Sequence, residues 1–175
     1  GYSEEILGKT LEGQRQNLVI ATKPSSSSAT RDKIIESCES SLKRLRTDYI
    51  DLYQIHWPSK DVPFEETLEA METLKKQGKI RAIGVCNFGE KDLDRILEVG
   101  SIETNQVAYN LIWRGIEYNI KPKCIDNNIG ILCYSPIAQG LLTGKWQNAD
   151  EVPEGRARTW HFSSERPGPR HGGAG

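Results

Sequence analysis

Apolar positions along the chain alternate between short runs and longer stretches with helical spacing. Five apolar runs of five or six residues, each bounded by polar or turn residues, occupy 18–22, 50–55, 80–85, 104–109 and 129–134. Runs of this length are typical of strands that are covered on both faces. The pattern therefore predicts five buried β-strands.

The segments between these runs carry apolar residues at helical spacing. The expected helices span 31–46, 64–77, 90–98 and about 117–127. Gly78 follows the second of them as a typical helix stop. A further helix is expected at the beginning of the chain, with Ser3 as its N-cap and Glu4 and Glu5 in its first turn.

Strands and helices that alternate about every 30 residues predict βαβ units with right-handed crossovers and a parallel sheet. A doubly wound sheet and part of a (β/α)8 barrel both satisfy this periodicity. No G-x-G-x-x-G motif follows any of the runs, which weakens the doubly wound dinucleotide-binding interpretation. A complete barrel needs roughly 250 residues, so a chain of 175 residues holds only part of one.

Composition serves mainly to exclude function classes. The chain is 37% hydrophobic and 27% charged with a formal net charge of −1, so nothing favours a nucleic acid or an anionic membrane as partner. No apolar run approaches the roughly 18 residues of a membrane span, and the first residues lack the features of a signal peptide. Cys38, Cys86, Cys124 and Cys133 form no C-x-x-C pair, and no His lies at metal spacing. We expect reduced, mostly buried thiols in a cytoplasmic protein, with no metal site.

Polar or aromatic side chains follow each of the five predicted strands. In parallel α/β architectures the functional residues lie at the carboxyl ends of strands. The residues at these positions are Lys23, His56, Cys86, Asn87, Gln106, Tyr134 and Ser135. Each has a structural explanation when taken alone: a solvated lysine, a hydrogen-bonded core histidine, or a cap for the next helix. Five successive strand ends of this kind together predict a site.

Longer motifs make a family resemblance specific. D-Y-I-D-L-Y-Q-I-H-W-P occupies 48–58, and G-K-I-R-A-I-G-V-C-N-F occupies 78–88. With Y-S-P at 134–136 and G-L-L-T-G-K at 140–145, these stretches resemble the aldo-keto reductase superfamily as far as about Arg158. The resemblance implies a parallel (β/α)8 TIM barrel, of which about five strand-helix units are present. It also implies an enzyme that transfers a hydride from NADPH to an aldehyde or ketone.

The resemblance assigns two catalytic residues of the family tetrad, Lys23 and His56. A lysine ammonium beside the proton-donating tyrosine stabilises its phenolate, and an imidazole orients the substrate carbonyl. The tetrad Asp and Tyr are not in this chain, because the family pattern Y-G-x-S-E-E places the Tyr directly before Gly1 and matches Tyr2 to a variable position. We therefore expect a chain that is cut at both ends and is inactive by itself.

The resemblance also assigns the residues that hold NADP(H). Cys86, Asn87 and Gln106 match the residues on the nicotinamide carboxamide, and Tyr134 matches the aromatic ring that stacks on the nicotinamide. The residues that match the family's loop along the pyrophosphate are Ser135, Pro136, Ile137, Ala138 and Lys145. Cys86 stands where the family usually has Ser, so its hydrogen bond would be weaker. The preference for NADPH over NADH is an expectation from the family alone.

The expected domain organisation is a partial barrel over 1–158 and a loop-like Pro/Gly/Arg-rich segment over 159–175. Two other interpretations stay open. One is an NADP-binding, non-turnover module that resembles the auxiliary subunits of channels. The other is a natural product of 175 residues with neither activity. For an enzyme, the expected partner is a small carbonyl substrate.

Overall fold

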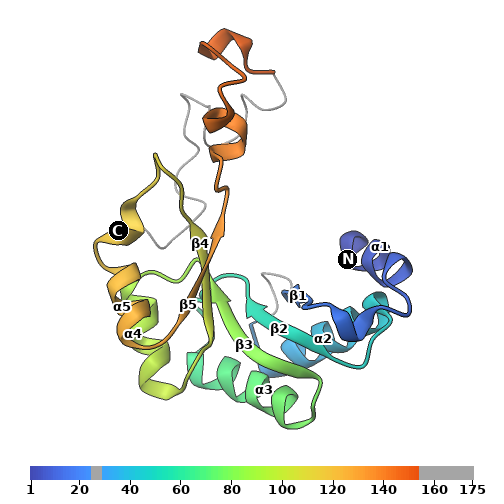
Figure 1. Cartoon of the computed structure of the whole chain (residues 1–175). Coiled ribbons are helices and arrows are strands. Elements are labelled where there is room, and N and C mark those ends of the chain that lie inside the picture. The colour runs from blue at the N-terminus through green and yellow to red at the C-terminus, as the bar shows by residue number, and fades with distance from the viewer. Residues whose placement is uncertain (25–28, 154–175) are drawn as a thin grey trace.

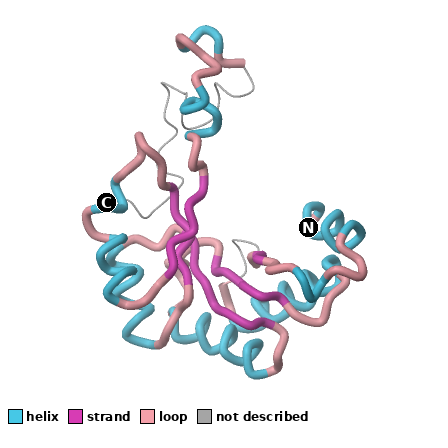
Figure 2. Tube along the Cα trace, viewed as in Figure 1, coloured by secondary structure: helices cyan, strands magenta, loops and turns pink. Residues whose placement is uncertain are grey.

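The computed structural model describes residues 1–24 and 29–153. Five parallel strands form one sheet in the order β1-β2-β3-β4-β5, so that each strand pairs with its neighbour in sequence. The sheet curls into part of a barrel with the helices on its outer side (Figures 1 and 2). The strands are Ala21–Thr22 (β1), Ile50–Ile55 (β2), Ile80–Cys86 (β3), Thr104–Ala108 (β4) and Gly130–Tyr134 (β5). The predicted partial (β/α)8 architecture is confirmed.

In the described part of the chain, five α-helices and four short 3-10 helices connect and flank the strands. The α-helices are Tyr2–Thr10 (α1), Arg31–Leu45 (α2), Phe64–Lys76 (α3), Glu90–Val99 (α4) and Ile120–Asp126 (α5). The 3-10 helices are Arg15–Asn17 (η1), Gly115–Glu117 (η2), Ala138–Thr143 (η3) and Ala149–Glu151 (η4). The segment with η3 and η4 projects beyond the end of β5, away from the helical layer (Figure 1). None of the helices in the described ranges combines the length and the apolar character that a membrane crossing requires.

The hydrophobic core lies between the sheet and the helices. All six residues of β2 are buried, as expected of a central strand with helices on one face and barrel interior on the other. The side chains that fill the core come mainly from β2, β3 and helices α2, α3 and α4. The fully buried ones include Ile34, Ile50, Tyr53, Met71, Leu74, Ile83, Phe88 and Ile96.

The first strand is shorter than the apolar run at 18–22 predicts. The N–H of Ile20 donates to Asp51 Oδ2 at 2.9 Å, while the Ile20 carbonyl accepts from the N–H groups of Asp51 and Leu52. Because a side chain takes the Ile20 N–H, regular pairing with β2 begins only at Ala21.

Two predicted helix beginnings are wrong. Helix α1 begins at Tyr2 with Gly1 as its N-cap, so Ser3 lies inside the first turn and caps nothing. The helix expected from 117 begins at Ile120 instead. Pro122 explains the delay, because inside a longer helix its ring would clash with the carbonyl of Tyr118, whereas the first turn tolerates proline.

Candidate active site

Several of the predicted site residues lie at one edge of the sheet. Lys23 follows β1, His56 follows β2, Asn87 follows β3, and Tyr134 ends β5. Parallel strands bring their carboxyl ends to the same edge. The described residues contain no group of three or more His, Cys, Asp or Glu side chains that could hold a metal ion.

The charge of Lys23 acts on His56. Burial and the positive charge of Lys23 lower the pKa of His56 below its usual value. The imidazole is therefore neutral at pH 7 and carries one N–H donor and one acceptor nitrogen. A neutral imidazole beside an ammonium group can hydrogen-bond a carbonyl oxygen and stabilise negative charge that develops there.

Glu4 of α1 holds the strand end that carries Lys23. Its carboxylate accepts from Thr22 Oγ1 at 2.6 Å and from Arg44 Nε at 2.7 Å, and the residue is 9% exposed. Burial alone would raise the pKa of Glu4, but the hydrogen bonds from Thr22, Arg44 and Ser41 lower it below its usual value. The ionised carboxylate thus ties α1 and α2 to β1, one residue before Lys23.

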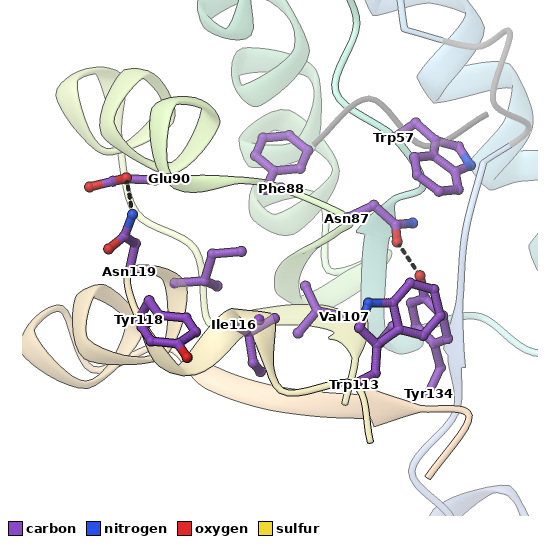
Figure 3. A pocket seen from close by; sticks show the side chains of 13 residues that line it. Trp57, Asn87, Phe88, Glu90, Val107, Trp113, Ile116, Tyr118, Asn119 and Tyr134 are labelled. Carbon is purple, nitrogen blue, oxygen red and sulfur yellow. Dashed lines mark hydrogen bonds between the residues drawn. The ribbon is translucent and has the colours of Figure 1, made fainter. Parts of the chain in front are cut away.

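Asn87 joins three strands at the site. Its backbone has a positive φ of 61°. Its side-chain Nδ2 donates to the His56 carbonyl at 3.2 Å, and its Oδ1 accepts from the Tyr134 hydroxyl at 2.9 Å (Figure 3). The amide therefore fixes the ends of β2, β3 and β5 relative to one another.

Backbone strain is concentrated among the predicted cofactor residues. Apart from glycines, six described residues have a positive φ; three of them, Asn87, Ser135 and Ala138, are predicted cofactor residues, and a fourth, Gln139, directly follows Ala138. A residue other than glycine in this conformation costs on the order of 1–3 kcal/mol, and such residues cluster at ligand-binding sites. The Ser135 carbonyl is held in addition by Asn110 Nδ2 at 3.0 Å. The hydrogen bond from Asn110 thus helps to hold the strained turn after β5 in place at this edge of the sheet.

The remaining predicted loop residues are less tightly held. Pro136, Ile137 and Lys145 are exposed. Lys145 lies on the projecting segment between η3 and η4, where its ammonium is 5.8 Å from the centre of the Trp146 ring. The contacts of the described residues do not bring Lys145 to the strand ends.

A mostly apolar pocket of about 340 Å³ adjoins the site. Asn87 and Tyr134 border it at the strand ends, and the connection from β4 to α5 supplies Trp113 and Ile116 (Figure 3). Its size falls within the range of small-molecule pockets, roughly 300–1,000 Å³. No motif in the sequence indicates that Trp113 and Ile116 contribute to it.

Cys86 is a buried thiol in a network of amides. It is 2% exposed, and burial raises its pKa to about 11, although the charge of Lys23 and a hydrogen bond from Gln54 oppose this shift. Gln54 Nε2 lies 3.0 Å from Cys86 Sγ and 2.7 Å from Gln106 Oε1. Gln54 and Glu4 both lie in this site, and the sequence patterns assigned neither of them a role there.

The raised pKa predicts an unreactive Cys86. Relative to the usual value of 9.0, a pKa of about 11 means about 100-fold less thiolate at pH 8. Iodoacetamide should therefore modify Cys86 of the native protein at least about 100-fold more slowly than after unfolding in urea. Mass spectrometry of the Cys86 peptide gives both rates, and the exposed Cys133 serves as the reactive internal standard. Equal rates for the two cysteines in the native protein would contradict the buried environment.

The sequence matches one family model and many curated proteins. The model, described as the aldo/keto reductase family, matches residues 1–163. Aldo-keto reductase YhdN of Bacillus subtilis is 46% identical over 155 residues, which cover 83% of this chain and 47% of that protein. Methylglyoxal reductase YeaE of Escherichia coli is 42% identical over 154 residues, covering 85% of this chain and 54% of that protein. The chain spans about half the length of these relatives.

Solved structures show the same relationship. An aldo-keto reductase from Klebsiella pneumoniae in complex with NADPH superimposes with a TM-score of 0.78 at 38% identity, covering 85% of this chain and 54% of that one. A glycerol dehydrogenase from Gluconobacter oxydans superimposes with a TM-score of 0.82 at 34% identity, covering 93% of this chain and 54% of that one. With a family model that matches nearly the whole chain, and with these structures sharing its fold, the chain belongs to the aldo/keto reductase family.

Proposed function

We propose that the full-length protein containing this chain is an oxidoreductase that reduces small aldehydes or ketones with NADPH. The observation that carries this proposal is the convergence of Lys23, His56, Asn87 and Tyr134 on one edge of the sheet. Family membership supports it, and one relative is named a methylglyoxal reductase.

The residues at this edge fit a dinucleotide cofactor. The NH2 groups of the Asn87 and Gln106 amides are hydrogen-bond donors suited to the carboxamide oxygen of a nicotinamide. The strained backbone at Ser135 and Ala138 is suited to holding a turn against a phosphate-bearing ligand. We assign Cys86, Asn87 and Gln106 to the carboxamide, Tyr134 to the ring, and Ser135, Pro136, Ile137, Ala138 and Lys145 to the pyrophosphate side. Bound NADPH supplies the hydride.

The residues of the chain itself act on the carbonyl oxygen. His56, neutral at pH 7, donates an N–H to that oxygen and orients the carbonyl carbon. The Lys23 ammonium lowers the energy of the negative charge that develops nearby. We expect the proton donor to be a tyrosine directly before Gly1 in the full-length protein, where Lys23 would lower its pKa.

Coenzyme preference and cellular location are finer parts of the proposal. NADPH is our expectation, although one relative in Escherichia coli, 40% identical over 138 residues and covering 77% of this chain and 42% of that protein, is named an NADH-specific methylglyoxal reductase. Competition between NADPH and NADH in one assay measures the preference. Four unpaired cysteines accord with the reducing cytoplasm as its location.

The full-length protein should oxidise NADPH in the presence of methylglyoxal, as measured by the loss of absorbance of the reduced cofactor. Residues 1–175 alone should show no turnover above buffer, because the expected Tyr and Asp lie outside this segment. Binding of NADPH by the full-length protein, without turnover of any of a panel of aliphatic and aromatic aldehydes, would instead support a sensing module. Turnover by the 175-residue segment would contradict the assignment of the proton donor.

A further inference from the structure

Gln54 is a fully buried polar residue that lies beneath the proposed nicotinamide site. It is 0% exposed and lies on β2 two residues before His56. Gln54 is the last residue but one of β2, and His56 directly follows the end of that strand. An amide in this position loses its hydrogen bonds to water, and each bond that the protein leaves unmade costs on the order of 1–3 kcal/mol.

The Gln54 amide makes its contacts on the next strand and on the strand beyond it. Its Nε2 donates to Gln106 Oε1 on β4 at 2.7 Å and to Cys86 Sγ on β3 at 3.0 Å. The side chain can extend this far because Gly84, its partner on β3, has no side chain. A Cβ atom on Gly84 would lie 2.9 Å from Gln54 Cγ and 2.4 Å from Thr104 Oγ1. Gly84 therefore leaves open the path from Gln54 to Gln106.

The cost of this arrangement indicates a purpose other than stability. Among the described residues, Gln54 Oε1 has no hydrogen-bond partner, so part of the amide's desolvation cost is not recovered. An apolar side chain of similar shape, such as methionine, would bury the same volume without that loss. What the amide does provide is a donor directed at the oxygen of Gln106.

We propose that Gln54 is a positioning residue that fixes which end of the Gln106 amide faces the nicotinamide. With Gln106 Oε1 accepting from Gln54, the Gln106 NH2 group is left to donate to the carboxamide oxygen of the cofactor. Without Gln54, the donor that remains for Gln106 Oε1 among the described contacts is the weak Cys86 thiol at 3.5 Å, so the Gln106 amide can turn over and present its oxygen, which repels that carboxamide oxygen. This inference rests on the proposed cofactor function and goes beyond it by adding a residue that touches no ligand itself.

The test compares two ligands in the full-length protein, NADPH and 2′-phospho-ADP-ribose, which lacks the nicotinamide. Fluorescence or calorimetric titration gives the Kd of each. Gln54→Met should raise the Kd of NADPH about tenfold, the effect of one hydrogen bond, and leave the Kd of 2′-phospho-ADP-ribose unchanged. Gln54→Glu, whose carboxylate can only accept, should turn the Gln106 amide over and raise the Kd of NADPH further. A general loosening of the fold would instead weaken both ligands together.

Thr104→Val is the matched control. Thr104 lies in the same layer beside Gly84, and its Oγ1 is buried without a hydrogen-bond partner among the described residues. Removing that hydroxyl changes the polarity of the layer but not the Gln106 amide, so both Kd values should stay as in the wild type. In addition, Gln54→Met should have little effect on NADPH binding in a Gln106→Met background, because the two residues act as one unit.

Three results separate the alternatives. Equal changes in the two Kd values, or none in either, would overturn the positioning role and leave the proposed cofactor function intact. Additive effects of Gln54→Met and Gln106→Met would overturn it as well. If the wild-type protein binds 2′-phospho-ADP-ribose and NADPH with the same Kd, or binds neither, the proposed nicotinamide site is itself wrong and the inference falls with it.

Discussion

Replacing Lys23 by methionine in the full-length protein should lower kcat for carbonyl reduction by about 10²–10⁴-fold, the contribution typical of a positioned acid–base group. The Kd of NADPH should change by less than about threefold, because in our assignment Lys23 acts on the reacting oxygen and not on the cofactor. Methionine keeps most of the length of the side chain and removes its charge. Single-turnover rates and cofactor titrations on the same preparation measure the two quantities.

The same substitution has a second, independent readout at His56. Burial and the charge of Lys23 together lower the pKa of His56. Without the ammonium only burial remains, so the pKa of His56 should rise toward its usual value, and the imidazole should protonate at a higher pH than in the wild type. NMR titration of the imidazole carbons follows this directly and requires no substrate.

Lys60→Met is the control for this pair of measurements. Lys60 is exposed and lies four residues after His56, so removing its charge should leave kcat unchanged and the pKa of His56 nearly so, because exposed charges are screened by water and salt. An unimpaired Lys23→Met protein would remove Lys23 from the mechanism. A fall in kcat with no change at His56 would instead mean that the two side chains do not interact as the structure indicates.

Periodicity was sufficient to predict most of the fold. The run at 50–55 is now β2, buried along its whole length, and the stop at Gly78 is a helix end with a φ of 71°. These features depend on local sequence, because alternating apolar runs and helix-ending residues act within a few positions. The position of Lys23 and His56 at strand ends follows from the same periodicity, whereas their catalytic roles depend on the family resemblance and stay predictions.

The parts that could not be predicted depend on contacts between distant segments. Glu4 has the sequence position of an ordinary first-turn acid, and only the packing of α1 on α2 turns it toward Thr22. Gln54 reads as one polar residue in an apolar strand, and its role becomes visible only when Gly84 and Gln106 lie beside it. The shortness of β1 has the same origin, because it depends on Asp51, which is 31 residues away from Ile20.

Asp51 itself should carry the largest stability effect. It is 9% exposed and lies at the beginning of β2, at the opposite end of the strand from His56. Its carboxylate accepts from Arg15 Nη2 at 2.6 Å and from Arg81 Nη1 at 2.9 Å, in addition to the Ile20 N–H. Both guanidinium groups also lie 3.8 Å from the centre of the Tyr49 ring. One carboxylate thus joins η1, the strand ends of β1 and β2, and β3.

Asp51→Ala in the full-length protein should lower the free energy of unfolding by about 3 kcal/mol, the low end of the cost of breaking a buried ion pair, because the half-buried Arg15 keeps its hydrogen bonds to Leu18 and Tyr49. Burial alone would raise the pKa of Asp51, but the Ile20 N–H and the charges of Arg15 and Arg81 lower it below 3.8. A carboxyl group whose pKa is lower in the folded than in the unfolded state stabilises the fold at any pH above its pKa in the unfolded state, which is about 4. It loses that contribution as the pH falls through its pKa in the folded state. The difference in the free energy of unfolding between Asp51→Ala and wild type, measured by urea unfolding, should therefore have its full size at pH 7 and become smaller below about pH 4.

Asp48→Ala is the control, because Asp48 lies three residues earlier and is exposed. This substitution should change the free energy of unfolding by less than about 0.5 kcal/mol. An equal loss for the two variants would mean that the buried network around Asp51 does not stabilise the fold.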